Sequence, residues 1–438
     1  MMFNVKKIVV SIFVSIAIGL YLWSSLLHSN TVNVHLERAD QGKYLSIVKT
    51  IHENNYWNLG DRNRTPLYPY LQSIFYTPSL SDAEAFVQGK TLNAVFSIVL
   101  LGIIYHVCSL HLRKTSSLAL LMISAFSLFV VRAGYYQVEL LYFSLSFFSF
   151  ISLVKCIQTP SYKRAFFTGL LVAITYYAKA SILLAVYLFI FFKLLQIAIA
   201  RIKQSRKRFK LHISSLVIFV SMFLIVLSPY LIENKMIYGK YFYNVNTTFY
   251  IWYDSYQEIQ QGTQKYGDTL HWPNMPESEL PSASKYFREH SLNQMLYREI
   301  NGLLWLIPVA IATSTAYLYL AFYSLFVIPT IMMERKSITN YLKNNIQKVL
   351  YVVSFLGVYI LAYAWYQNVE IGSRFILSLV LPALFSLLYF LQQSKILIKK
   401  HKKMWNLSYL DVLNLLIIAV VTVDFFTITG TILREVQQ

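Results

Sequence analysis

The densest group of polar side chains in the sequence follows the first long apolar run. Its charged and phenolic members are Glu37, Asp40, Tyr44, Asp61, Arg62 and Arg64. Asp40 comes shortly after the apolar run, so its carboxylate is expected near the membrane surface, where it could act as a general base toward an incoming hydroxyl group. A capped helix start with local salt bridges would explain the same residues without any function.

Three further charged residues stand beside or within apolar runs. Glu139 opens a run after a short hairpin, and Lys179 separates two other runs. Charges at such positions are costly unless they have a partner or a function. Glu139 could simply pair with Arg132, and Lys179 could extend its ammonium group to the membrane interface. Asp424 stands alone in the last run and is expected to accept a hydrogen bond inside the bundle.

The elements that must position these residues are apolar runs of close to the roughly 20 residues that a helix needs to cross a bilayer. The chain is 56% hydrophobic and only 13% charged, and the runs lack the charged face of a soluble helix. The runs are Ile8–Leu27 and others centred near Leu101, Ser124, Phe147, Ala173, Val186, Phe223, Ala310, Val358, Leu384 and Ile417. The predicted fold is an all-α polytopic membrane protein with about eleven transmembrane helices, within a range of about ten to thirteen.

The basic residues are distributed unevenly over the predicted turns. With the N-terminus in the cytoplasm, the inward turns hold most of the Lys and Arg residues, while the acids fall almost entirely on the other side. This positive-inside bias predicts a cytoplasmic N-terminus. The net charge of +19 therefore indicates turns that face anionic lipid rather than a nucleic-acid site. The basic inward turns are residues 111–114, 155–164, 201–210, 334–348 and 395–403.

Two outward segments are long, residues 29–90 and 233–299. Both contain amphipathic stretches, so amphipathic helices are expected in these first and fourth outer loops, and loops of such length are usually functional. The tyrosines of the fourth loop suit either stacking on sugar faces or an aromatic belt at the membrane interface. The region 300–333 is counted as one crossing, because two would put the basic turn after it on the wrong side. Residues 1–438 are predicted to form a single transmembrane domain without a separate soluble domain.

Several stretches match sequence signatures in a fixed order between about residue 37 and residue 390. They are RADQGKYLSIVKTI, GDRNRTPLYPYLQSIFY, YYQVELLYFSLSFF, SPYLIENKMIYGKYF and IGSRFILSLVLPALF. The first two stretches together resemble the first outer loop of the GT-C glycosyltransferases. The third resembles the acid that opens a later span in that family, the fourth its P-W-x-x-R-N-x-x-x-[FY]-G signature, and the fifth its late R-[YF]-x-x-x-x-x-P span. These enzymes use polyprenyl-phosphate-linked sugars and include protein O-mannosyltransferases and the aminoarabinose transferases of lipid A.

The chain departs from the family pattern at three points. The usual Trp of the signature is Tyr230, and the usual Arg-Asn is Glu233-Asn234. The first loop has Glu37 and Asp40 apart, where many members have adjacent acids. The large soluble C-terminal domain of some members is missing. These departures leave the donor sugar and the acceptor open.

The resemblance implies roles for individual residues. Asp40 would be the base of an inverting transfer, with Glu139 as a second catalytic candidate. Arg374 would bind the phosphate, with Arg62 and Arg64 as second choices, because a guanidinium can hold a phosphate through two parallel hydrogen bonds. The remaining candidates for substrate binding are Tyr44, Lys179, Glu37 and Asp61.

The expected donor is a polyprenyl- or dolichyl-phosphate sugar, and the expected acceptor is a lipid, a glycan or a protein. Membrane lipids are further expected partners, whereas nucleic acid is not. If the source is bacterial, the chain is expected in the plasma (inner) membrane with its site facing the periplasm or exterior. Most relatives outside the oligosaccharyltransferases need no metal, although Asp40, Glu139 and Asp61 could jointly hold a hard divalent cation through oxygen ligands.

Two other classes of function fit the same outline. One is a transporter or flippase of lipid-linked sugars, although such proteins often show inverted repeats, and none is visible in the sequence. The other is a non-catalytic subunit of an envelope-glycan assembly complex.

Overall fold

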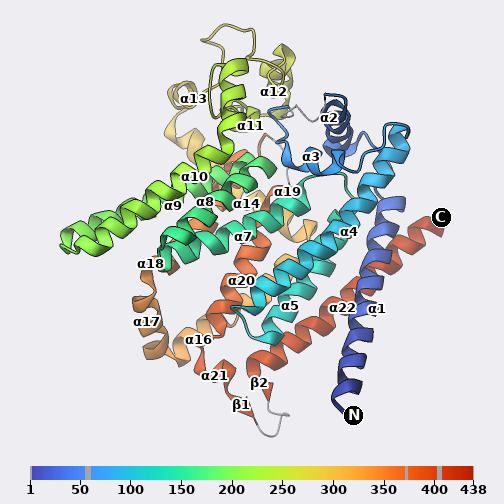
Figure 1. Ribbon diagram of the computed structural model, residues 1–438, viewed down its shortest axis with the longest axis vertical. Coiled ribbons are helices and arrows are strands. Elements are labelled where there is room, and N and C mark those ends of the chain that lie inside the picture. The colour runs from blue at the N-terminus through green and yellow to red at the C-terminus, as the bar shows by residue number, and fades with distance from the viewer. Residues whose placement is uncertain (1, 55–60, 370–372, 402–406, 438) are drawn as a thin grey trace.

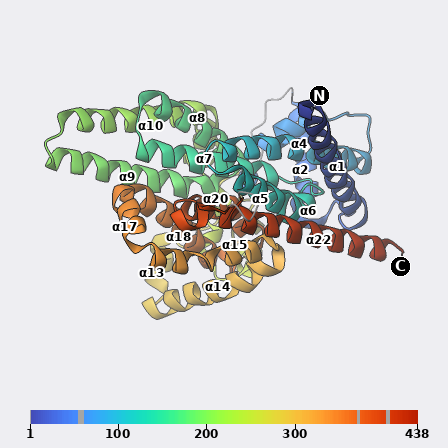
Figure 2. The same cartoon turned by 90° about the horizontal axis from the view of Figure 1, so that it is seen from below.

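The computed structural model describes residues 2–54, 61–369, 373–401 and 407–437. Of these, residues 2–13, 39, 373–374, 401, 428 and 431–437 are described by their backbone alone. The described chain is built from helices, with one small antiparallel hairpin of β1 (Lys400–His401) and β2 (Leu407–Ser408) (Figure 1). Helices α1 and α14 lie on opposite sides of the bundle (Figure 2).

Long helices make up the bundle. They and the segments that continue them are α1 (Met2–Thr31), α4 (Asp82–Ser109), α5 (Lys114–Ser124), η2 (Ala125–Phe129), α6 (Val130–Arg132), α7 (Glu139–Gln158), α8 (Tyr162–Ala178), η3 (Ala180–Ile182), α9 (Leu183–Ile202), α10 (Arg206–Tyr238), α14 (Leu292–Thr313), α15 (Ala316–Ser324), α16 (Val327–Met333), α18 (Ile346–Tyr366), α19 (Ser373–Ile376), η6 (Leu377–Leu379), α20 (Val380–Leu391) and α22 (Tyr409–Gln437). In the described part of the chain, nine helical segments are long and apolar enough to cross a membrane. The protein is therefore an all-α polytopic membrane protein.

Short helices cover the ends of the bundle. They are η1 (Arg38–Asp40), α2 (Gln41–Glu53), α3 (Leu67–Ser73), α11 (Val245–Thr248), η4 (Tyr250–Trp252), α12 (Tyr256–Gln261), η5 (Thr263–Tyr266), α13 (Ala283–Glu289), α17 (Arg335–Asn344) and α21 (Lys395–Ile398). Both long segments predicted to be outer loops, residues 29–90 and 233–299, thus contain helices. In Figure 1, α2, α11 and α12 lie along the top, whereas α17, β1 and β2 lie along the lower edge.

Local signals fix where several long helices begin and end. Ser81 caps α4 and Ser291 caps α14, each in a reciprocal arrangement with the side chain three residues later. Such capping boxes satisfy two backbone N–H groups that the first turn of a helix leaves unpaired. Helix α10 ends at Gly239, whose φ of +70° is accessible to glycine at little cost.

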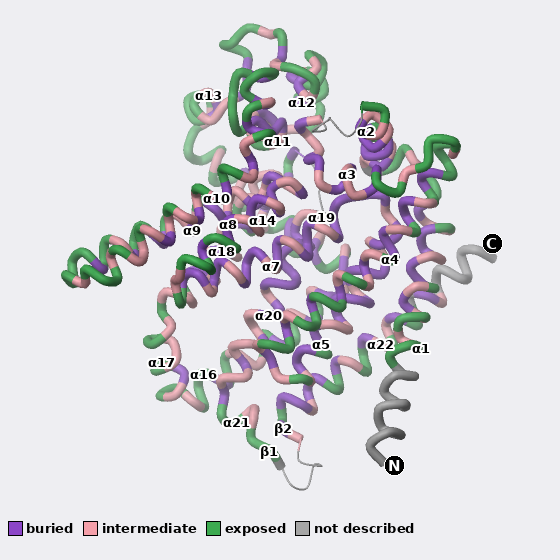
Figure 3. Tube along the Cα trace, viewed as in Figure 1, coloured by how far each residue is buried: buried purple, intermediate pink, exposed green. Residues whose placement is uncertain are grey.

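The side chains sort between the interior and the outer surface of the bundle (Figure 3). Phe147 and Val172 are fully buried, whereas Phe191, Ile225 and Val353 are more than half exposed. An exposed apolar surface over many helices is costly in water but suits a hydrocarbon environment. This distribution agrees with a membrane location.

Glycines allow two pairs of helices to approach closely. A Cβ atom placed on Gly302 of α14 would lie 2.0 Å from the carbonyl oxygen of Ala364 in α18. On Gly169 of α8, it would lie 2.6 Å from the carbonyl oxygen of Phe219 in α10. Membrane helices pack through such small residues because lipid supplies little drive for them to associate.

Polar side chains of α22 bind other helices inside the bundle. The Tyr319 hydroxyl donates a hydrogen bond to Asp424, which confirms the predicted role of this aspartate. The Tyr323 hydroxyl donates to Asn414 at 2.8 Å, and Arg113 forms an ion pair with Asp411 at 2.8 Å. Each contact satisfies a group that would be costly to leave unpaired in a membrane.

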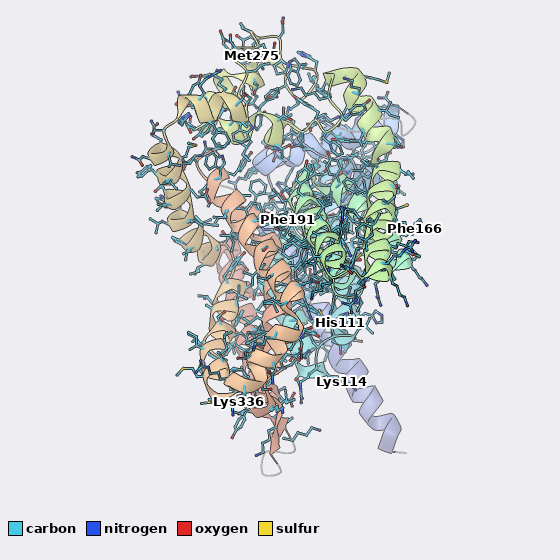
Figure 4. The ribbon with its side chains drawn as sticks, turned by 90° about the vertical axis from the view of Figure 1, so that its left-hand side faces the viewer. His111, Lys114, Phe166, Phe191, Met275 and Lys336 are labelled. Atoms are coloured by element: carbon cyan, nitrogen blue, oxygen red, sulfur yellow. The ribbon has the colours of Figure 1, made fainter. Side chains whose placement is uncertain are left out.

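Helices α14, α15 and α16 follow one another along the bundle. Met275 and Lys336, which precede and follow them, lie at opposite ends of the molecule (Figure 4). Near the start of α14, Arg298 donates a hydrogen bond to the carbonyl of Trp365, at the end of α18. An extended residue, Ser314, separates α14 from α15. The chain therefore passes from one end of the bundle to the other without folding back.

The segment 238–280 forms a small hydrophobic core of its own. Tyr238, Tyr243 and Tyr250 are at most 6% exposed, and the rings of Tyr238 and Tyr243 stack with centroids 4.0 Å apart. The interpretation of these three tyrosines as an interfacial aromatic belt is therefore wrong. They hold the fourth outer loop together, because buried aromatic pairs add favourable contacts beyond the area they bury.

Candidate functional site

A cavity of about 910 Å³ opens between the two outer loops and the adjacent ends of the spanning helices. It is lined by the start of α2, by residues 63–64, by α11 and α12, and by residues 366–369. Its charged lining side chains are Glu37, Asp40, Lys43, Arg64, Glu139 and Lys179. The structure thus brings six of the predicted site residues to one cavity: Glu37, Asp40, Tyr44, Arg64, Glu139 and Lys179.

Asp40 stands at a strained position of the backbone. Its φ is +70° and its ψ is 1°, which is the left-handed region, at the junction between η1 and α2. Non-glycine residues adopt this region uncommonly, although Asp and Asn do so more often than most. Such strain clusters at functional sites, where the surrounding structure maintains it. The conformation supports the hypothesis that Asp40 is a functional residue.

Arg64 lies between two carboxylates. It forms ion pairs with Asp40 and with Asp61, the latter at 2.8 Å. Burial lowers the pKa of Arg64 most strongly, but the Asp61 and Asp40 carboxylates together outweigh burial and leave the pKa raised. Asp61 also accepts hydrogen bonds from the backbone N–H groups of Asn63 and Arg64, at 3.0 and 2.6 Å. Asp61 does not line the cavity but holds Arg64, which does, and substrate binding by Asp61 stays a prediction.

Glu139 and Lys179 form a second charged pair in the cavity. The Nζ atom of Lys179 lies 3.9 Å from Oε1 of Glu139 and 4.2 Å from the ring centroid of Phe375. Glu139 is 3% exposed, at the first residue of α7. Among the described residues, Glu139 therefore forms an ion pair with Lys179 and none with Arg132, the partner predicted from the sequence. A charge pair at this depth is a functional candidate.

Arg62 does not line the cavity. It is 1% exposed, forms an ion pair with Glu233 at 2.7 Å and donates a hydrogen bond to Asn234. Its guanidinium carbon lies 4.6 Å from the ring centroid of Tyr230. Its guanidinium connects the first outer loop to the end of α10, and its role as a phosphate ligand stays a prediction. Two of the residues that contact this arginine, Tyr230 and Glu233, are positions where the sequence departs from the signature it resembles.

Two asparagines are cavity residues that the chemical reasoning missed. The side chain of Asn246 donates a hydrogen bond to Oδ1 of Asn63 at 2.7 Å, and the Tyr366 hydroxyl donates to Asn246 at 2.7 Å. All three residues line the cavity. Each asparagine begins an N-x-T sequence, and Asn63 also stands within the polar group of the first outer loop. Amide and hydroxyl groups of this kind hydrogen-bond well with sugar hydroxyls.

The remaining predicted residues differ in their exposure. Tyr44 is 6% exposed and meets the ring of Tyr68 edge to face at 5.3 Å, so only part of its surface reaches the cavity. Glu37 is exposed at the rim. The side chain of Arg374 lies outside the described residues. Its role as phosphate ligand stays a prediction.

A metal site receives no support from the geometry. Within the described part of the chain, no three His, Cys, Asp or Glu side chains lie close enough to hold a metal ion. Asp40 and Glu139 do share the cavity, but Asp61 does not line it. The three carboxylates predicted as oxygen ligands of a hard cation, Asp40, Glu139 and Asp61, therefore do not all line this cavity.

Comparisons with known proteins yield no relative. No family model, no curated protein and no solved structure matches the chain.

Proposed function

We propose that the protein is a glycosyltransferase that moves a sugar from a polyprenyl- or dolichyl-phosphate donor to an acceptor hydroxyl on the outer face of a membrane. The observation that carries this proposal is the cavity in which a strained Asp40, the Glu139–Lys179 pair and Arg64 meet hydrogen-bonding amides. The ordered resemblance to GT-C glycosyltransferases supports it. The cavity is large enough for a sugar and part of its carrier, since ligand sites usually measure about 300–1,000 Å³.

In the proposed reaction, Asp40 accepts the proton of the acceptor hydroxyl as the hydroxyl oxygen attacks the anomeric carbon. The bond from that carbon to the phosphate oxygen breaks, and the lipid phosphate leaves with the electron pair. Configuration at the carbon is inverted, because attack and departure take place on opposite faces. Arg64 and Lys179 are the cations that would stabilise the developing charge on the phosphate. Arg64 also orients the Asp40 carboxylate through their ion pair.

The proposed topology has eleven crossings with a cytoplasmic N-terminus. Of the nine long apolar segments, α14 and α15–α16 follow one path and count once. Adding α1, α8 and the α19–α20 segment, which is shorter, restores the number predicted from the sequence. His111, Lys114 and Lys336 then lie toward the cytoplasmic end, away from Met275 (Figure 4), which agrees with the positive-inside rule. In a bacterial source this is the plasma membrane, with the cavity facing the periplasm or exterior.

The decisive test is a transfer assay with Asp40→Asn. Purified protein in membrane vesicles is given a panel of polyprenyl- and dolichyl-phosphate hexoses and pentoses with a membrane extract as acceptor. The measured product is the released lipid phosphate. We expect Asp40→Asn to lower the rate about 10²- to 10⁴-fold, the usual contribution of a general base.

Glu53→Gln is the matched control, because it removes an exposed carboxylate from the other end of α2. If Asp40→Asn, with normal expression and melting temperature, transfers sugar at the wild-type rate, the assignment of the base is wrong. If the wild-type protein releases no lipid phosphate but moves a lipid-linked sugar across sealed vesicles, the transfer proposal fails and the flippase alternative takes its place.

A further inference from the structure

A second cavity, of about 640 Å³, lies toward the opposite end of the bundle from the first. Its walls come from α7, α15, α16, α18 and α20, and nearly all of its deep lining residues are apolar. Phe150, Val352 and Phe390 represent three of these helices. A cavity of this composition gains little by holding water, because water needs several polar partners.

The polar residues of this cavity gather at its rim and are mainly cationic. Lys155, Lys348 and His111 line it, and no acidic residue does so in the described part of the chain. None of the three forms an ion pair with another described residue. The Nζ atom of Lys348 lies 3.7 Å from the ring centroid of Tyr389, which holds the ammonium group at the rim.

The two lysines lie close enough to His111 for both of their charges to affect its imidazole. Burial lowers its pKa most, and the charges of Lys155 and Lys348 lower it further. Its Nε2 atom is buried and has no hydrogen-bond partner among the described residues. A buried polar atom without a partner is costly, so a ligand that accepts or donates a hydrogen bond there gains free energy.

The dimensions of the cavity match an amphiphile. From Lys348 to Leu356, both of which line it, α18 rises about 12 Å at roughly 1.5 Å per residue. The cavity thus has positive charges at one end, and an apolar cleft about 12 Å long extends from them. A free anion would leave the cleft empty, and an uncharged lipid would leave the cations uncompensated.

We propose that this cavity binds one anionic phospholipid of the adjacent leaflet. The phosphate lies between Lys155, Lys348 and His111, and one acyl chain lies between α7, α16, α18 and α20. Basic pockets between transmembrane helices on the cytoplasmic side are suited to such head groups. That side is the one predicted for residues 111–114 and 334–348. The proposal does not depend on sugar transfer, since it uses neither the residues nor the cavity of the first site.

Native mass spectrometry of the full-length protein in a neutral detergent tests the proposal. The protein is titrated with phosphatidylglycerol and phosphatidylcholine of identical acyl chains. We expect the first bound phosphatidylglycerol to have an apparent Kd at least about tenfold below that of phosphatidylcholine, and Lys155→Gln/Lys348→Gln to abolish this preference. Lys203→Gln/Lys207→Gln is the control, because it removes the same charge from exposed positions outside the cavity.

A second variant tests the acyl chain. Val352→Trp fills the apolar part of the cavity and leaves the cations in place, so it should weaken phosphatidylglycerol binding while the melting temperature stays unchanged. Equal binding of the two lipids by the wild-type protein would overturn the proposal. So would equal loss of preference in the two lysine double variants, displacement of phosphatidylglycerol by excess inorganic phosphate, or tight binding of polyprenyl phosphate without binding of phospholipid.

Discussion

The two cavities of the bundle differ in how their charges are compensated. The first cavity, between the two long loops, is called the outer cavity from here on. In it Arg64 and Lys179 each lie beside a carboxylate, so both positive and negative charges are present. The second cavity is called the inner cavity. In it Lys155 and Lys348 line a mostly apolar cleft, and no acidic residue is among its described lining residues. Charges that already have a partner in the protein can stay in place while substrates bind and leave. Unpaired positive charges instead favour an anion that stays bound. Under the two proposals made above, the difference separates a site for turnover from a site for a resident ligand.

The largest expected effect concerns the connection that holds the outer cavity in shape. Arg62→Met leaves Glu233 and Asn234 without their partner, and breaking a buried charge pair costs about 3–5 kcal/mol. Because Glu233 is one-third exposed, we expect a cost near the lower limit. Thermal unfolding in detergent measures it. Arg62→Met/Glu233→Gln should recover part of the loss, and an unchanged melting temperature in the single variant would contradict the assigned role.

A smaller effect is expected for the pair within the outer cavity. Glu139→Gln and Lys179→Gln should each be destabilising, and the double variant should cost less than the sum, with a coupling free energy of about 1 kcal/mol. A double-mutant cycle on the melting transition measures the coupling. Additive effects would show that the 3.9 Å contact between Glu139 and Lys179 contributes no coupling free energy. The charge of Lys179 would then not be compensated as described for the outer cavity.

The core of the fourth loop predicts a pH-dependent effect of similar size. Burial raises the pKa of Asp268 above its ordinary value of 3.8. A raised pKa means that the folded state holds the proton more tightly, so stability is lost as the pH rises through the folded-state pKa. Asp268→Asn cannot ionise and should be more stable by about 1 kcal/mol at neutral pH.

Melting curves between pH 3 and pH 8, roughly the range that brackets the titration of a buried carboxyl group, measure this dependence. The gain from Asp268→Asn should shrink toward the acid end. A gain that is constant over the whole range would show that ionisation is not its cause.

The smallest effect is expected in the inner cavity. Lys155→Met and Lys348→Met remove charges that have no described ion-pair partner, so their cost in detergent without anionic lipid should be under about 0.5 kcal/mol. Added phosphatidylglycerol should raise the melting temperature of the wild-type protein more than that of either variant. A large loss of stability without lipid would show that these lysines bind protein groups, and the two cavities would then not differ as described.

The sequence predicts the fold class well because apolar length and charge asymmetry are local properties. The helical class is an example, since the length and composition of each apolar run indicate it before any contact is known, whereas the single crossing of residues 300–333 stays a prediction. Asp40 and Glu139 could be identified as candidates because each stands next to an apolar run. That the two residues line the same cavity depends on how the helices pack, and the spacing of residues in the sequence does not reveal this packing.

The pairings of the arginines could not be predicted. Arg62 and Arg64 are two residues apart and have the same chemistry, yet Arg62 turns into the protein toward Glu233 and Arg64 lines the cavity. The partner of Arg62 lies 171 residues away in the chain. Asn63 and Asn246 were missed for the same reason, because an amide becomes a site residue only through the groups that surround it.

The bond between Arg62 and Glu233 also has a consequence for biogenesis. A ribosome that adds about 5–20 residues per second needs roughly 9–34 s to make the intervening chain. During that interval the first outer loop has already emerged from the translocation channel, while its anchor at the end of α10 does not yet exist. The bond between Arg62 and Glu233 can therefore form only after the chain has been made as far as the end of α10. A pulse-chase experiment with limited proteolysis should find that full protection of the first loop is delayed until α10 is complete.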